Sequence, residues 1–110
     1  MISKVSVDMD VLVCEKEIKG FLDKDGKLYT YPAKFKKQLF ALRYLASKFD
    51  HGRQYTEKEV NALLNDWHTF GDWALLRRDL CDRHFIGREP DGSRYWLEQP
   101  QPTLASFALE

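Results

Sequence analysis

Arginine is concentrated in the last third of the chain, where two arginines are adjacent. Residues 73–98 hold five arginines, no lysine and five acidic side chains. The planar guanidinium group fits phosphate oxygens and guanine edges better than an ammonium group does. Residues 24–59 add nine basic side chains against four acidic ones. Together these stretches predict a phosphate-facing surface, and the alternative is a solvated face with ordinary salt bridges.

Arg78 is the first candidate for contact with a base or a phosphate. Helical geometry turns Arg78 outward together with Ala74 and Asp82, because residues four apart lie on one face. Two acids, Asp79 and Asp82, belong to the same helix and oppose the approach of an anion.

The second group of candidates flanks a turn near the C-terminus. Arg88 and Arg94 stand on either side of residues 90–93 and are expected to lie close together. Adjacent like charges are mildly unfavourable, so an anion nearby would help, either Glu89 or a phosphate. The residues predicted to contact DNA are Lys37, Ala74, Arg78, Arg88, Ser93 and Arg94.

Two polar residues are expected to have structural roles instead. Arg77 lies near the apolar side of its helix and is predicted to pair with a carboxylate, that of Asp72 or that of Glu59. Asn61 is predicted to fix the angle between two helices through side-chain hydrogen bonds.

An enzyme, a metal site and a cofactor are not predicted. Cys81 and His84 share a helix face, but a zinc site needs three or four protein ligands and no second pair exists in the sequence. The sequence has no glycine-rich phosphate loop and no recognisable hydrolase motif.

The elements that must position these side chains follow from apolar spacing and capping signals. The pattern from Thr56 to Glu59 predicts a capping box. Asp72 is predicted to cap a helix, and residues 23–26 are predicted to form a turn. The predicted elements are an N-terminal helix capped by Asp8 or Asp10, a short strand near 27–31, helices from Pro32 to Phe49, from Thr56 to Trp67 and from Trp73 to about His84, an extended link at 53–55, and strands 85–89 and 94–98.

The order of these elements predicts an α+β, mostly helical fold of the winged helix-turn-helix type. Three core helices and a C-terminal β-hairpin form the wing arrangement, with an extra N-terminal helix. The predicted organisation is residues 1–31 packing on the core, residues 32–98 as the winged-helix core, and residues 99–110 as a flexible, proline-containing tail, of which Leu104, Phe107 and Leu109 could dock.

Two resemblances support this interpretation. Residues 76–80, Leu-Arg-Arg-Asp-Leu, with Phe-Ile-Gly-Arg at 85–88, resemble the recognition helix and wing start of DeoR-type bacterial repressors. A broader pattern is similar to the prokaryotic domain of unknown function number 2087. Its motifs here are residues 18–21, Gly26, 32–34, Lys37, 55–61, Asp72, 76–80, Arg88, 91–93 and 95–96. That resemblance implies a link to bacterial transcription regulation and supplies no mechanism.

The composition fits one soluble folded domain. The chain has 110 residues, of which 44% are hydrophobic and 14% aromatic, and its formal net charge is zero. This profile argues against a disordered tail. The longest apolar runs, such as residues 11–14, have four residues, against about 20 for a membrane span. Two cysteines 67 positions apart make no disulfide framework, and we expect a cytoplasmic location.

The predicted function is transcription regulation through binding of double-stranded DNA by the third core helix and the wing. A homodimer is a candidate assembly. The alternative is a protein-protein interaction module on the same fold that binds no DNA, marked by an apolar patch around Trp67, Phe70 and Trp73. A ligand-sensing domain with an aromatic-lined pocket is a weaker third hypothesis.

Overall fold

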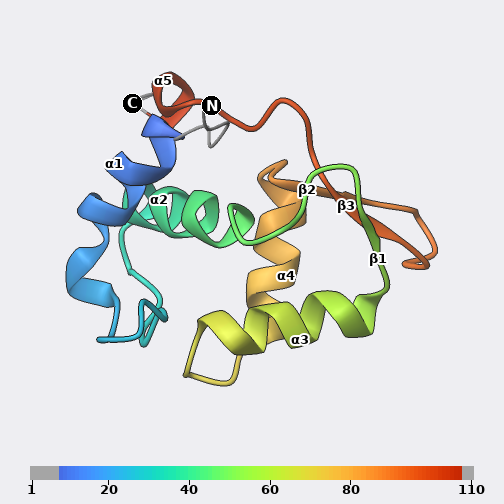
Figure 1. The fold of residues 1–110 in the computed structure, drawn as a ribbon, viewed down its shortest axis with the longest axis horizontal. Helices are drawn as coiled ribbons and strands as arrows, with labels where there is room; N and C mark the ends of the chain where they lie inside the picture. The colour runs from blue at the N-terminus through green and yellow to red at the C-terminus, as the bar shows by residue number, and fades with distance from the viewer. Residues whose placement is uncertain (1–7, 108–110) are drawn as a thin grey trace, which may run out of the picture.

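A computed structural model describes residues 8–107 and has an α+β fold, about half helical, with one small antiparallel sheet (Figure 1). The elements are α1 (Met9–Glu17), the 3-10 turn η1 (Lys19–Phe21), α2 (Phe35–Ala46), β1 (Gln54–Tyr55), α3 (Glu57–Trp67), α4 (Trp73–Asp82), β2 (Ile86–Arg88), β3 (Tyr95–Leu97) and α5 (Leu104–Phe107). None of the helices within residues 8–107 has both the length and the apolar character that crossing a bilayer requires.

Helix α2 is the central element of the core. Every residue from Leu39 to Ala46 is buried, because α1 covers one side of this helix and α4 covers another. The sequence predicts a helix start at Pro32, but α2 begins at Phe35 and Lys34 is its extended N-cap. The carbonyl of Pro32 instead accepts a hydrogen bond from the side chain of Gln38. Phe35, predicted to be on the apolar stripe, is 52% exposed.

Helices α3 and α4 begin where the capping signals predict. Thr56 and Glu59 form the complete capping box of α3, and the side chain of Asp72 accepts from the amide of Leu75 at the start of α4. Helix α4 ends at Asp82, earlier than predicted, because His84 has a positive φ of 68°. Trp73, the first residue of α4, is 39% exposed.

The sheet joins the hairpin to the segment between α2 and α3. Its strand order is β1-β3-β2, with Tyr55 opposite Tyr95 and Arg88 also opposite Tyr95 on the other side. The segment predicted as an extended link is therefore a strand. Both hairpin strands are shorter than predicted, at three residues each. The side chains of Trp96 and Glu98 lie so close over Gly87 that a Cβ there would be 2.5 Å from each.

The segment between η1 and α2 contains the predicted turn but no regular strand. Gly26 has a φ of +78°, and Asp23 accepts hydrogen bonds from the amides of Asp25 and Lys27. Leu28 makes only isolated bridges, to Leu22 and to His68. The short strand predicted after the turn is therefore reduced to single bridges.

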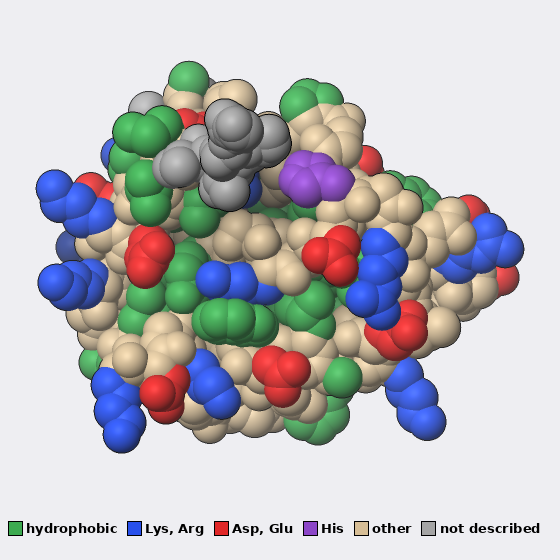
Figure 2. All heavy atoms as spheres, in the orientation of Figure 1, with side chains coloured by type: hydrophobic (Ala, Val, Ile, Leu, Met, Phe, Trp, Pro, Cys, Tyr) green, Lys and Arg blue, Asp and Glu red, His purple; other side chains and the backbone are tan. Residues whose placement is uncertain are grey.

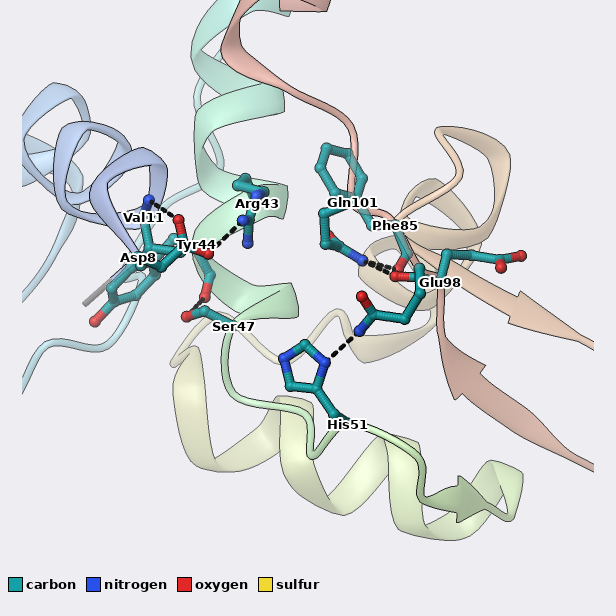
Figure 3. A network of polar contacts seen from close by, with 10 residues as sticks. Asp8, Val11, Arg43, Tyr44, Ser47, His51, Phe85, Glu98 and Gln101 are labelled. Atoms are coloured by element: carbon teal, nitrogen blue, oxygen red, sulfur yellow. Dashed lines mark hydrogen bonds and ion pairs between the residues drawn. The ribbon is translucent and has the colours of Figure 1, made fainter. Parts of the chain in front are cut away.

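The N-terminal helix is fastened to α2 by apolar and charged contacts. Cys14 and Ile18 of the predicted apolar face are fully buried, and burial raises the pKa of the Cys14 thiol to about 12. Asp8 is the N-cap of α1, and its second carboxylate oxygen accepts from Arg43 of α2 at 2.6 Å (Figure 3). The Arg43 side chain is nearly buried, and this ion pair is one of two described polar links between the two helices, the other being Lys37 with Glu17.

The C-terminal segment returns to the core. Phe107, in α5, is buried between Phe40 and Phe85, with ring centroids 5.6 and 6.1 Å away. Before it, the side chain of Gln101 donates hydrogen bonds to the carbonyls of Phe85 and Glu98 (Figure 3). Leu109 lies outside the described residues.

Candidate nucleic-acid interface

An open hollow of about 630 Å³ lies between the start of α3, the outer face of α4 and the hairpin. Ala74 and Arg78 line it from α4, and Arg88 lines it from β2. Three of the six predicted DNA-contacting residues thus surround one concave surface. We call this surface the arginine hollow.

Arg78 is the most available cation of the arginine hollow. Its side chain is 70% exposed, and its one ion pair among the described residues is a 4.0 Å contact with the neighbouring Asp79. Asp79 itself is turned inward, where it accepts a hydrogen bond from the hydroxyl of Tyr31 at 2.8 Å. Burial, followed by this bond to Asp79, raises the pKa of Tyr31. Arg78 is therefore held only weakly and can reach an external anion.

Arg77 is held much more firmly than Arg78. Its Nη1 donates to the side chain of Asn61 in α3, and its Nη2 is 3.7 Å from a carboxylate oxygen of Glu57. Arg77 is thus paired with a carboxylate, and Asn61 makes a side-chain hydrogen bond between α3 and α4, as predicted. The carboxylate that pairs with Arg77 is Glu57 and not the predicted Asp72 or Glu59, whose carboxylates accept from the backbone amides of Leu75 and Thr56.

The hairpin brings Arg88 and Tyr95 to the hollow. The hydroxyl of Tyr95 donates to Oε1 of Glu57 at 3.3 Å. Burial raises the pKa of Tyr95; the charge of Arg77 opposes this shift and that of Glu57 adds to it. The sequence analysis did not place Glu57 or Tyr95 in this site. A prediction that β1 pairs with β3, which brings the start of α3 beside the hairpin, would have found them.

The other predicted contact residues lie elsewhere. Lys37 is on α2, where its ammonium group binds the carboxylate of Glu17 at 2.8 Å and joins α2 to α1. Ser93 and Arg94 are exposed near the hairpin tip and do not line the hollow. Arg94 faces Glu89, whose amide donates to the Arg94 carbonyl, so Arg88 and Arg94 are not opposite each other in the hairpin.

The arginine hollow is balanced in charge. Arg77, Arg78 and Arg88 line it, and so do three carboxylates, those of Glu57, Asp72 and Asp82. Figure 2 shows the same pattern on the face that it draws, where basic and acidic side chains are interspersed and no large patch of one sign forms. Any anion that binds in the hollow must therefore compete with resident carboxylates.

His68 and Cys81 carry reactive side-chain groups, but both side chains are buried or partly buried in the fold. His68 is buried, with Nδ1 donating to the carbonyl of Leu64 at 2.6 Å and Nε2 accepting from the amide of Asp72 at 2.9 Å. This tautomer is assigned from the two partners. Burial raises the pKa of the Cys81 thiol. Within residues 8–107 no group of three or more His, Cys, Asp or Glu side chains is arranged to hold a metal ion.

Comparisons with known proteins give one match. The family model described as "Uncharacterized protein conserved in bacteria (DUF2087)" covers residues 27–97. No curated protein and no solved structure matches the chain. The matched range includes α2 through β3, and therefore the whole arginine hollow, but not α1 or α5. The chain belongs to the DUF2087 family of bacterial proteins.

Proposed function

We propose that this protein is a winged-helix transcription regulator that binds double-stranded DNA through α4 and the β2–β3 hairpin. In this interpretation α4 enters the major groove and the hairpin lies along the sugar-phosphate backbone. The proposal rests on the order of the elements, on the placement of two arginines and on a local sequence resemblance.

The order of elements supports a winged helix. From α2 onward the chain runs helix, strand, helix, helix, strand, strand, and the first strand pairs with the last in a sheet ordered β1-β3-β2. A two-stranded hairpin directly after the third helix of the core stands where a wing is expected. The first strand, β1, ties that wing to the helix pair α3 and α4.

The observation that carries the proposal is that Arg78 and Arg88 line the same hollow, although they come from different elements. The outward residues of α4, Ala74, Arg78 and Asp82, are exposed, and no other described element covers them. Helix α1 packs against α2 on the opposite side of the molecule from the hairpin (Figure 1). A DNA duplex can therefore reach α4 and the hairpin together.

The resemblance to DeoR-type repressors at residues 76–88 fits this geometry. Leu76 and Leu80 are fully buried and hold α4 on the core, while Arg78 between them is turned to solvent. An arginine in that position can read a guanine edge or contact a phosphate.

The proposal is tested by fluorescence anisotropy of a labelled duplex of random sequence, titrated with protein at several salt concentrations. Binding that weakens with salt is expected, with a dissociation constant of about 10⁻⁴ to 10⁻⁶ M near physiological salt. Arg78→Ala and Arg88→Ala should each weaken binding, and each lost phosphate contact should reduce the salt slope by about one. Lys16→Ala, which removes an exposed charge from α1, is the control and should bind like the wild type.

Two results would overturn the proposal. One is the absence of any salt-dependent binding to the duplex at low salt. The other is equal loss of affinity in the Arg78, Arg88 and Lys16 variants, which would indicate non-specific attraction to the whole surface.

A protein-interaction module remains the second candidate, and α1 favours it. Met9, Leu12 and Val13 of α1 are 66%, 48% and 39% exposed. The patch expected around Trp67, Phe70 and Trp73 is not formed, because Trp67 and Phe70 pack on the core. A second copy of the chain is the simplest partner for α1. If so, light scattering should report a dimer that Leu12→Lys converts to a monomer, and a wild-type monomer would remove this support.

A further inference from the structure

The carboxylate of Glu57 contacts two donor groups in the arginine hollow. Its Oε2 lies 3.7 Å from Nη2 of Arg77, and its Oε1 accepts from the hydroxyl of Tyr95 at 3.3 Å. Arg88 lines the same hollow from the hairpin. One guanidinium group and one hydroxyl therefore meet at this carboxylate, and a second guanidinium group stands in the same hollow.

This donor set is suited to a phosphate oxygen. Arginine pairs and hydroxyl groups supply most side-chain contacts to nucleic-acid phosphates, and charge-assisted bonds of this type are the stronger ones. A phosphodiester carries one negative charge, as Glu57 does, so it can replace the carboxylate without changing the charge of the hollow.

Glu57 is held loosely enough to be displaced. Its two polar contacts are longer than the usual 2.7–2.9 Å of a charge-assisted bond, and its side chain is 51% exposed. Glu57 is the first residue of α3, and its side chain is not part of the capping box, which Thr56 and Glu59 complete. Rotation of the Glu57 side chain into solvent would therefore leave the start of α3 intact.

We propose that Arg77, Arg88 and Tyr95 form a phosphate subsite of the DNA interface and that Glu57 occupies this subsite until a DNA phosphodiester displaces it. This inference rests on the proposed function and extends it. Arg78 stays outside the subsite and is free to contact a base. Glu57 weakens binding to every sequence equally, specific and non-specific sites alike, and sequence readout is left to Arg78.

The test compares duplex binding by the wild type and by Glu57→Gln across a salt series. The glutamine variant keeps the shape of the side chain and removes its charge. It should bind about three to ten times more tightly at low salt, because the phosphate no longer has to displace a carboxylate. Its salt slope should stay close to that of the wild type, because the same phosphate is bound in both complexes. Glu57→Asp, which shortens the side chain, should give a smaller gain in affinity for the duplex. It replaces Glu57→Gln in the test if the glutamine variant does not fold.

Three controls separate displacement of Glu57 from general electrostatics. Glu17→Gln removes a carboxylate that is also paired with a cation, Lys37, but lies on α1, and should leave affinity unchanged. Asp82→Asn removes another charge that lines the hollow, from α4. Adding Arg88→Ala should abolish the gain caused by Glu57→Gln and should not abolish any gain caused by Asp82→Asn.

The outcomes distinguish this inference from the proposed function. If the wild type binds DNA and folded Glu57 variants bind equally well or more weakly, the phosphate subsite is wrong and the proposed function stands. A gain that survives Arg88→Ala also overturns the subsite. If no variant binds the duplex, the proposed function fails and the subsite fails with it.

Discussion

Arg77 of α4 donates a hydrogen bond from Nη1 to the side-chain oxygen of Asn61 in α3. The guanidinium group also faces Glu57 at the start of α3, so one side chain links α4 to two positions of the preceding helix. The hydrogen bond to Asn61 ties α4 to α3 beside Arg78, the next residue. We therefore expect it to constrain where Arg78 stands relative to the hairpin.

The first prediction concerns this link. Asn61→Ala should lower the free energy of unfolding by about 1–3 kcal/mol, because the partly buried Arg77 loses an acceptor. Urea unfolding of Asn61→Ala, of Arg77→Ala and of the double variant measures the coupling between the two side chains, expected at about 0.5–3 kcal/mol. Asn65→Ala, at an exposed position on the same helix, is the control and should change stability little. Additive effects of the two single variants would contradict the link.

The second prediction concerns Asp8 and acid stability. Burial raises the pKa of Asp8, but the hydrogen bond and charge of Arg43 and the amide of Val11 outweigh this, so the pKa lies below its ordinary value of 3.8. A lowered pKa gives stability that is present above the ordinary value and is lost as the pH falls through the lowered one. The free energy of unfolding, measured from pH 7 downward, should therefore decrease as the pH falls from 3.8 through the lowered pKa of Asp8.

Asp8→Asn should reduce this acid dependence. It should also cost about 1–2 kcal/mol at neutral pH, because Arg43 stays nearly buried without a charged partner. This cost is smaller than for a fully buried pair, since the Asp8 side chain is 50% exposed. Asp10→Asn, on the same turn but without contact to Arg43, is the control. If the free energy of unfolding of Asp8→Asn decreases at acid pH as much as that of the wild type, other carboxylates cause the decrease.

The third prediction concerns Gly87 in β2. A methyl group at this position would lie 2.5 Å from the ring nitrogen of Trp96 and from a carboxylate oxygen of Glu98. Gly87→Ala should therefore destabilise the protein by about 1–3 kcal/mol as Trp96 is pushed aside. Thermal unfolding gives the loss, and tryptophan fluorescence should report the movement. Gly20→Ala, with no atom within 4 Å of the added carbon, should be tolerated. Wild-type stability in Gly87→Ala would mean that Trp96 is not packed as described.

The fourth prediction concerns His68, which satisfies two backbone groups in the core. His68→Phe keeps an apolar ring but leaves the carbonyl of Leu64 and the amide of Asp72 without their partners. A loss of about 2–4 kcal/mol is expected from two unpaired backbone groups. Denaturant unfolding measures it. His84→Asn, which tolerates the positive φ at that exposed position, is the control. A small loss would show that water replaces the ring nitrogens.

Local signals in the sequence predicted the helix starts at Thr56 and Asp72 because capping depends on residues three positions apart. They also predicted the turn at Gly92, which needs a positive φ. The start of α2 was misplaced, since the chain stays extended to Lys34 and the carbonyl of Pro32 accepts from the side chain of Gln38. The pairing of β1 with β3 was missed because it joins residues about 40 positions apart, which no local pattern encodes.

The candidate site was predicted in part. The outward direction of Arg78 follows from helical periodicity alone, and the placement of Arg88 follows from the hairpin. The role of Glu57 could not be predicted, because residue 57 meets residues 77 and 95 only after two helices and a sheet have packed together. Lys37 was included among the predicted DNA contacts because residues 24–59 carry an excess of positive charge. Its ion pair with Glu17 depends on how α1 docks on α2.

The burial of Phe107 has a practical consequence for anyone who trims this protein to its family boundaries. A recombinant fragment spanning only residues 27–97 would lack that ring, and the aromatic faces of Phe40 and Phe85 that it covers would be left to water. Such a fragment would expose apolar surface and should therefore aggregate and precipitate more readily than the whole chain. Weak activity of that fragment in an assay would then reflect the loss of Phe107 from the core, and not the activity of the whole protein.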